Sequence, residues 1–255
     1  MYAKKSLGQH FLTSQGAIDN IIDAGDIVGD DTILEIGPGK GVLTEKLVFF
    51  AGKVIAVEKD DALFELLKEK LKKEIKSKKL ELINADILDY EPTGKYKLIA
   101  NIPYNITGAI FKKFLSTEHQ PERTVMLVQK EVAERIVAKD KKESILSLSV
   151  KAYGQPKYIQ TVKAGSFSPA PKVDSAIISI ENISKEFFST FSEEDFFTIL
   201  RAGFKSKRKK LSSNIATVLE KEKVLEAFKK LNLDENLRAE DLNVDGWKKL
   251  AEKLF

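Results

Sequence analysis

The stretch TILEIGPGKGVLTEKL, residues 32–47, joins an apolar strand pattern to a helix pattern through a turn rich in glycine. Gly37, Gly39 and Gly41 let the backbone bend tightly in this turn and approach a ligand closely. The helix that follows opens with backbone N–H groups that have no partner inside the helix and can bind a ligand. The stretch therefore predicts the first strand, turn and helix of an open α/β sheet, with a ligand site at the carboxyl end of the strand.

Strand and helix patterns continue to alternate after this turn. The next strand patterns are KVIAVEK (53–59), LELINA (80–85), KLIA (97–100) and RTVMLVQK (123–130). Such alternation indicates βαβ units and a parallel sheet, so we predict a Rossmann-like α/β fold.

The segments after residue 146 complete this first domain. We expect SLSVKAYG (147–154) to be a strand or the approach to one, and YIQTVKAG (158–165) and SAIISIEN (175–182) to form a closing hairpin. The segment between the last two, SFSPAPKVD (166–174), holds two prolines and is predicted to lack regular structure.

Only helix patterns follow residue 184, which predicts a small all-helical domain. We therefore divide the chain into a sheet domain, residues 1–184, and a helical domain, residues 185–255. Ser192 and Ser212 each precede an amphipathic run and are predicted to start helices.

The composition excludes several kinds of chemistry. The chain of 255 residues has no Cys and only two His, His10 and His119, which excludes thiolate nucleophiles, disulfides and Cys/His zinc sites, and we predict no metal centre. The N-terminus has no apolar run of signal-peptide length and nothing resembles a membrane span, so we expect a cytoplasmic protein with no membrane partner. A net charge of +4 is compatible with a polyanionic partner.

The spacing of the glycine turn and the acids after it point to one ligand. The G-x-G-x-G spacing fits neither the dinucleotide fingerprint nor a P-loop. Glu58 ends the next strand, where its carboxylate can accept hydrogen bonds from both hydroxyls of a ribose. Asp86 follows the strand after that. There it can accept a hydrogen bond from the amino group of adenine, beside an apolar wall formed by Ile87. Ligand-facing groups at three successive strand ends indicate S-adenosylmethionine. The alternatives are a purely structural turn and solvated acids.

The stretch LIANIPYN, residues 98–105, suggests how a nucleobase is held. The amide oxygen of Asn101 and a backbone carbonyl fixed by Pro103 can both accept from one planar NH2 group, while the ring of Tyr104 stacks on the base. Methyl transfer to such an amine needs positioning and partial charge stabilisation, with no general base and no covalent step. The alternative is a proline turn with Tyr104 packed in the core.

Seven stretches together resemble one family, the ribosomal RNA adenine N6,N6-dimethyltransferases of the KsgA type. They are KKSLGQHFL (4–12), ILEIGPGKGVLTEKL (33–47), VIAVEKD (54–60), NADILDY (84–90), NIPYNIT (101–107), FSPAPKVDSAI (167–177) and RAGFKSKRKKLSSNI (201–215). The first five are also shared by the macrolide-resistance methyltransferases that modify large-subunit RNA. The resemblance implies a class I S-adenosylmethionine-dependent methyltransferase sheet with a C-terminal helical domain.

The resemblance also assigns roles to residues. It implies that the cofactor is bound by Gln9, His10, Leu12, Gly37, Gly39, Glu58, Asp86, Ile87 and Asn101. Asn101 and Pro103 would also hold the target amine, with Tyr104 stacked on one face of the base and Phe167 on the other. Asn is commoner than His at position 10, and the family often has Ser or Thr and a Pro where this chain has residues 108–110, so these two places depart from the pattern.

A run of six cations without an acid, residues 201–210, is the predicted RNA contact. Its cations are Arg201, Lys205, Lys207, Arg208, Lys209 and Lys210, and the alternative for such a run is a solvated helix face. The lysines of residues 68–79 alternate with Glu and are interpreted as plain surface.

The family's activity is the prediction for this chain. The resemblance implies dimethylation of two adjacent adenines in the hairpin loop near the 3′ end of small-subunit ribosomal RNA, by a monomer that acts on the immature subunit. The alternatives are a resistance methyltransferase for large-subunit RNA and a non-catalytic RNA-binding factor in ribosome assembly or transcription.

Overall fold

The computed structural model describes residues 9–102 and 106–255. Contacts divide the chain into two compact units, the first made of residues 1–133 and 155–183 and the second of residues 134–154 and 184–255.

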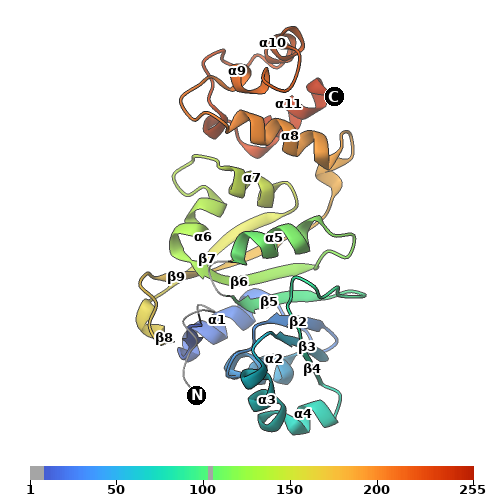
Figure 1. Ribbon diagram of the computed structural model, residues 1–255, viewed down its shortest axis with the longest axis vertical. Helices are drawn as coiled ribbons and strands as arrows, with labels where there is room; N and C mark the ends of the chain where they lie inside the picture. The colour runs from blue at the N-terminus through green and yellow to red at the C-terminus, as the bar shows by residue number, and fades with distance from the viewer. Residues whose placement is uncertain (1–8, 103–105) are drawn as a thin grey trace. The chain divides into compact units, whose positions relative to one another are not determined.

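The first unit is built on a sheet of seven strands in the order β4-β3-β2-β5-β6-β9-β7 (Figure 1). The strands are β2 (Thr32–Ile36), β3 (Lys53–Glu58), β4 (Leu80–Asn84), β5 (Lys97–Asn101), β6 (Arg123–Gln129), β7 (Gln155–Val162) and β9 (Ser175–Glu181). The strands from β2 to β6 are parallel, whereas β9 pairs antiparallel with both β6 and β7. The predicted Rossmann-like sheet and its antiparallel β7–β9 closure are both confirmed.

The strand order reverses between β2 and β5. From β2 the chain moves outward in one direction through β3 to β4, and from β5 it moves in the other direction to β6. Right-handed crossovers then place the connecting helices on opposite faces of the sheet, which leaves a crevice at the carboxyl ends of β2 and β5. An open α/β sheet binds its ligand at such a crevice.

Helices cover the sheet of this unit. They are α1 (Gln15–Gly25), α2 (Val42–Phe50), α3 (Asp61–Lys70), α4 (Lys72–Lys76) and α5 (Thr107–Ser116), and α6 (Lys130–Val137) crosses into the second unit. Ser14 caps α1 through the N–H of Ala17, and Asp60 caps α3 through the N–H groups of residues 62 and 63. Residues 61–76 form two helices and not one, because Leu71 between α3 and α4 departs from helical geometry (φ −109°, ψ 28°).

The N-terminal segment pairs with a segment far away in the sequence. In β1 (Phe11–Leu12), Phe11 lies opposite Ser168 and Leu12 opposite Phe167 of β8 (Phe167–Ser168), and the two strands are antiparallel. The prediction that residues 166–174 lack regular structure is therefore wrong for Phe167 and Ser168. A long-range pairing of this kind depends on tertiary contacts that local composition does not report.

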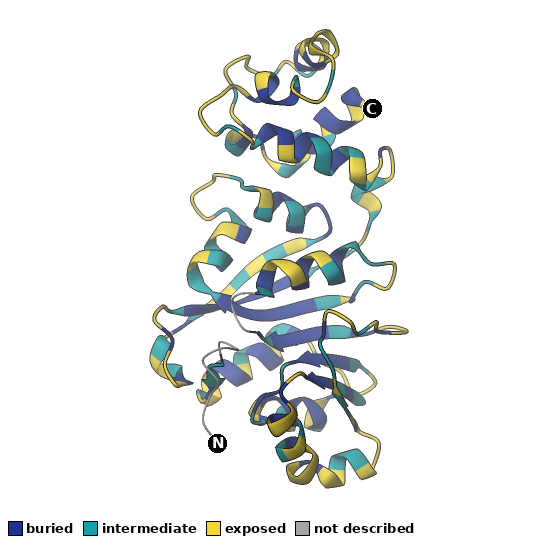
Figure 2. Cartoon of the chain, in the orientation of Figure 1, coloured by how far each residue is buried: buried dark blue, intermediate teal, exposed yellow. Residues whose placement is uncertain are grey.

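The second unit is helical. Its helices are α7 (Ile145–Lys151), α8 (Glu193–Gly203), α9 (Leu211–Ile215), α10 (Lys221–Lys230) and α11 (Val244–Leu254). They enclose a core that contains Phe196 and Trp247, both 0% exposed, and Figure 2 shows buried residues along α8 and α11.

Two sequence predictions in this unit are wrong. Residues 147–154 are not a strand, because Ser144 and Ser147 form a reciprocal capping box that starts α7. Ser212 does not start a helix, since α9 begins at Leu211 and Lys210 occupies the cap. Ser192 does cap α8 as predicted, by accepting from the N–H of residue 195.

The expected domain division at residues 184 and 185 differs from the contact grouping. Residues 134–154 group with the C-terminal helices, and Leu148 and Ala152 belong to their buried cluster. Leu148 in α7 and Ala152 at its C-terminal cap are four residues apart, which places them on the same face and joins them to this core. Among the described residues, no helix is long and apolar enough to cross a membrane.

Candidate functional site

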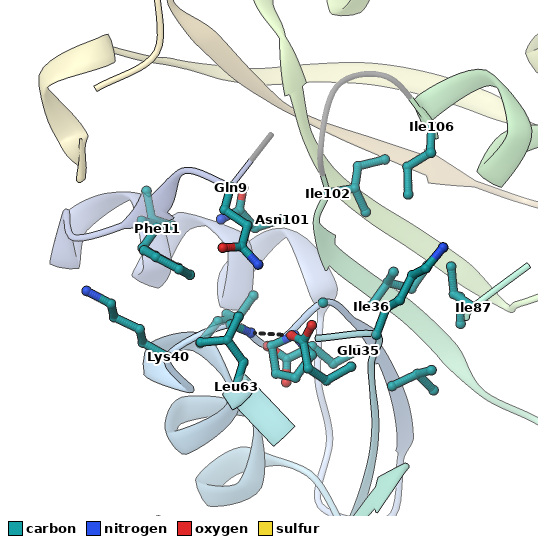
Figure 3. A pocket seen from close by; sticks show the side chains of 18 of the residues that line it. Gln9, Phe11, Glu35, Ile36, Lys40, Leu63, Ile87, Asn101, Ile102 and Ile106 are labelled. Atoms are coloured by element: carbon teal, nitrogen blue, oxygen red, sulfur yellow. Dashed lines mark hydrogen bonds between the residues drawn. The ribbon is translucent and has the colours of Figure 1, made fainter. Parts of the chain in front are cut away.

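A pocket of about 280 Å³ lies at the carboxyl ends of β2, β3, β4 and β5 (Figure 3). Most of its wall is formed by residues that end or follow these strands and by the segment 9–12, and residues of α2, α3 and position 106 complete it. All nine residues predicted to bind the cofactor line it: Gln9, His10, Leu12, Gly37, Gly39, Glu58, Asp86, Ile87 and Asn101. The parallel sheet thus brings together residues that are up to 92 positions apart in the sequence, from Gln9 to Asn101.

The glycine turn forms one side of this pocket. Gly37, Gly39 and Gly41 have φ angles of 63°, 60° and 79°, a region that side chains with a Cβ rarely adopt. A Cβ on Gly39 would lie 3.1 Å from the ring of Phe11, and one on Gly41 would lie 2.8 Å from Leu67. The turn therefore needs glycine both for its backbone angles and for its close approach to its neighbours.

Glu58 is held rigidly beside the turn. Its Oε2 accepts from the N–H of Gly39 at 3.1 Å and its Oε1 from the N–H of Asp60 at 2.9 Å. Burial raises the pKa of Glu58, and the two N–H groups oppose that rise. Each carboxylate oxygen has a further lone pair, so both can still accept from a pair of hydroxyl groups.

Asp86 lies on the more open side of the pocket. Its Oδ2 accepts from Nζ of Lys59 at 2.6 Å and its Oδ1 from the N–H of Leu88 at 2.9 Å. The bond from Lys59 lowers the pKa of Asp86, which therefore remains an ionised acceptor. Ile87, the next residue, is 5% exposed and adds an apolar surface to the same wall.

Hydrogen bonds tie the N-terminal segment to the pocket. Asn101 donates from Nδ2 to the carbonyl of His10 at 3.4 Å, and Gln9 donates from Nε2 to Asp60 at 3.3 Å. The ring Nδ1 of His10 lies 2.8 Å from the carbonyl of Pro169. Segments far apart in the sequence therefore close one side of the pocket together.

Three residues predicted to hold the target base are not found among the described residues that line the pocket. Pro103 and Tyr104 lie outside the described residues. Phe167 is 5% exposed, belongs to the core cluster that includes Leu12, and is not among the described residues that line the pocket. The roles assigned to these three residues stay predictions.

The sequence analysis missed Glu35, which lines the pocket and is 1% exposed (Figure 3). Burial raises its pKa to about 8, and no described residue hydrogen-bonds its Oε2. A buried polar atom without a partner is costly unless a ligand supplies one. Its signal in the sequence is a lone acid inside the apolar strand TILEI.

Phe11 and Lys40 were also missed. Nζ of Lys40 lies 4.7 Å from the centre of the Phe11 ring, a cation–π distance, and both side chains line the pocket (Figure 3). This contact joins the glycine turn to the N-terminal segment.

The predicted RNA-binding residues belong to the second unit. Arg201 is in the last turn of α8, while Lys205, Lys207, Arg208, Lys209 and Lys210 lie in the connection to α9, so most of the run is a loop. All six side chains are exposed, and none forms an ion pair with a described residue. We call residues 204–210 the basic loop.

A buried amide holds the basic loop. Asn214 of α9, 2% exposed, donates from Nδ2 to the carbonyl of Gly203 at 2.7 Å and to that of Ser206 at 3.0 Å. The loop therefore has a fixed base beneath its exposed cations. Sequence reasoning missed Asn214 because its partners are backbone carbonyls, which leave no residue pattern.

Comparisons with known proteins agree with this architecture. A family model described as ribosomal RNA adenine dimethylase matches residues 1–254. A ribosomal RNA small subunit methyltransferase A from Dehalococcoides mccartyi is 44% identical over 98% of this chain and 87% of its own length. The protein of the same name from Fusobacterium nucleatum is 39% identical over 99% of this chain and 97% of its own length.

Two crystal structures are similar over nearly the whole chain. A dimethyladenosine transferase from Plasmodium falciparum matches with a TM-score of 0.84 and 29% identity, covering 94% of this chain and 96% of that one. The 23S rRNA methyltransferase ErmE matches with a TM-score of 0.78 and 25% identity, covering 96% of this chain and 99% of that one. The predicted fold class and family resemblance are thereby confirmed: the chain belongs to the ribosomal RNA adenine dimethylase family.

Proposed function

We propose that this chain transfers methyl groups from S-adenosylmethionine to the N6 amines of two adjacent adenines in the 3′-terminal hairpin loop of small-subunit ribosomal RNA. As a member of its family it is a ribosomal RNA adenine dimethyltransferase that depends on S-adenosylmethionine. The observation that carries the methyl-transfer chemistry is the pocket lined by all nine predicted cofactor residues, at the sheet edge where such a fold binds its ligand.

The side chains of the pocket suit this cofactor. S-adenosylmethionine supplies an electrophilic methyl group on a cationic sulfur. Glu58 offers two oxygens to the ribose hydroxyls, and Asp86 with Ile87 offers an acceptor and an apolar wall to the adenine ring. The buried Oε2 of Glu35, which has no partner among the described residues, is available for a hydrogen bond with a polar group of the ligand.

The target base would enter the pocket beside Asn101. Because Nδ2 of Asn101 donates to the carbonyl of His10, the amide oxygen points away from that bond and can accept from the target amine. Pro103 and Tyr104 are proposed to add the carbonyl acceptor and the stacking ring. Their joint effect is to hold the base so that its nitrogen lone pair attacks the methyl carbon, and positioning supplies most of the rate.

The adenine must first leave its stack. Sequence-specific recognition of RNA mostly uses loops, whose bases can be turned out at low cost. The exposed cations of the basic loop would bind phosphates around the turned-out base. We also propose that the partner is the immature small subunit, and that the chain acts in the cytoplasm as a monomer.

A second candidate function follows from the similarity to ErmE. Methylation of large-subunit RNA would use the same pocket, since the fold is shared over 96% of this chain. The relatives at 44% and 39% identity are named for the small subunit, which favours the first proposal.

Methyl transfer to isolated subunits separates these possibilities. Radiolabelled S-adenosylmethionine is incubated with the chain and with unmethylated small or large subunits, and the labelled nucleosides are identified. We expect N6,N6-dimethyladenosine in small-subunit RNA only. Label in large-subunit RNA would favour the second candidate, and the absence of both label and calorimetric cofactor binding would favour a non-catalytic RNA-binding factor.

A further inference from the structure

A second surface of the first unit exposes two aromatic rings. Phe49 in the last turn of α2 is 77% exposed, and Phe50 beside it is 42% exposed. Their rings pack edge to face with centres 5.0 Å apart. Burying a Phe side chain is normally favourable, so a ring left this open is available to a partner.

Lysines share a groove with this ring. The groove lies between the end of α2 and residues 70–79, and its lining includes Phe49, Lys70, Lys73 and Lys79. Leu71 and Val48, which are 2% and 7% exposed, anchor its two sides in the core. We call this surface the Phe49 groove. It shares no lining residue with the cofactor pocket.

The charges around the groove do not cancel. Residues 68–79 hold seven Lys and two Glu. Three of these lysines form ion pairs, namely Lys68 with Glu65, Lys70 with Glu45 and Lys72 with Glu69. The other four, Lys73, Lys76, Lys78 and Lys79, are exposed and form no ion pair within the described part of the chain. The sequence shows the excess of Lys over Glu, but it does not show which of these lysines are paired, because Lys70 pairs with Glu45 of another helix.

We propose that the Phe49 groove is a second RNA-binding surface, in which the unpaired lysines contact phosphates and the ring of Phe49 stacks on an unpaired base. Exposed cations beside an aromatic ring match what single-stranded RNA presents, since every base has a stacking face next to a charged backbone. The site goes beyond the proposed function, because it lies outside the cofactor pocket and the basic loop and acts on binding rather than on chemistry.

The charge part of the proposal is tested with two matched double variants. Lys73→Gln with Lys79→Gln removes two unpaired lysines of the groove, whereas Lys68→Gln with Lys72→Gln removes two paired lysines of the same segment. Binding of the full chain to unmethylated small subunits is measured from about 50 to 200 mM salt. The first variant is expected to reduce the slope of log K against log salt by about 1 to 2, and the second to leave it unchanged. The proposal would be overturned if both double variants had the same salt slope, or if Lys73→Gln with Lys79→Gln had the salt slope of the unmodified chain.

The aromatic part is tested at Phe49, which is 77% exposed, so its substitution removes little packing from the core. Phe49→Leu keeps an apolar side chain without a ring and is expected to weaken RNA binding about fivefold or more, whereas Phe49→Trp should retain it. For Phe49→Leu and for Lys73→Gln with Lys79→Gln, methyl transfer at saturating RNA should keep its kcat while KM for RNA rises; the paired-lysine control and Phe49→Trp should keep both values. Unchanged RNA binding by Phe49→Leu would contradict an RNA surface. If the same variant lost binding to anionic lipid vesicles, the surface would be assigned to a membrane and not to RNA. The unmodified chain is measured in the same methyl-transfer assay. Its activity tests the proposed function, whereas the difference between it and the variants tests the Phe49 groove.

Discussion

Asn101 is the described residue on which the proposed chemistry depends most directly. It ends β5 at the crevice, lines the pocket and is oriented by its bond to His10. We predict that Asn101→Ala lowers kcat for methyl transfer by about a hundredfold or more, because losing one oriented group at the reacting atoms costs that much in other enzymes. RNA binding should be nearly unchanged in a filter-binding assay. An equal loss of binding and of methyl transfer would contradict the assigned role.

Glu35 makes the stability of the fold depend on pH. Burial raises its pKa from 4.5 to about 8, so between these values the folded chain holds a proton that the unfolded chain has released. The stability due to this proton is fully present below about pH 4.5 and is lost as the pH rises through about 8. The loss amounts to at most about 1.4 kcal/mol per pH unit from this group, and Glu58, whose pKa is also raised, acts in the same direction.

Substitution of Glu35 tests this directly. Glu35→Gln should flatten the decrease in the free energy of unfolding between pH 5 and 8, measured by urea denaturation, and should be more stable than the unmodified chain at pH 8. Glu222→Gln, at an exposed position on α10, is the control and should retain the decrease. Identical pH profiles for Glu35→Gln and the unmodified chain would show that Glu35 is not protonated in the fold.

At the scale of elements, the basic loop is the proposed electrostatic contact with RNA. Its cations have no ion-pair partner among the described residues, so each can neutralise a phosphate. Replacing residues 207–210 with Gln should weaken RNA binding and reduce the salt slope by about 3, at roughly 0.7 to 0.9 for each lost phosphate contact. An unaltered slope would mean that the loop faces solvent in the complex.

The fixed base of this loop makes a separate prediction. Asn214→Ala leaves the carbonyls of Gly203 and Ser206 without their amide donor, so it should reduce the free energy of unfolding by about 1–3 kcal/mol. Amide hydrogen exchange in residues 204–210 should become faster. Ser213→Ala, at an exposed position of the same helix, is the control. Unchanged exchange in Asn214→Ala would show that the loop is held by other contacts.

Elements differ in how well the sequence predicts them. The ends of β2 and β3 were predictable, because a glycine turn and a final acid mark them. Residues 147–154 were not, because LSV alternates as a strand does while the helix is started by a reciprocal bond between Ser144 and Ser147. The break at Leu71 also has no local signal such as Pro or Gly.

At the scale of the whole molecule, the site was more predictable than the packing. Six of the nine predicted cofactor residues end or follow strands β2 to β5, and a parallel sheet brings these strand ends to one edge, so motif positions translate into a pocket. Contacts between distant segments lack such a rule. The β1–β8 pairing, the grouping of residues 134–154 with the C-terminal helices and the partnerless oxygen of Glu35 all arise from tertiary structure.

A crystal structure of the chain with S-adenosylhomocysteine tests the central claim most directly. We predict that the ribose hydroxyls lie within hydrogen-bond distance of Glu58, that the adenine ring contacts Ile87 with its amino group at Asp86, and that the sulfur faces Asn101. A ligand bound away from the carboxyl ends of β2 to β5, or turned so that its sulfur points away from Asn101, would contradict the account.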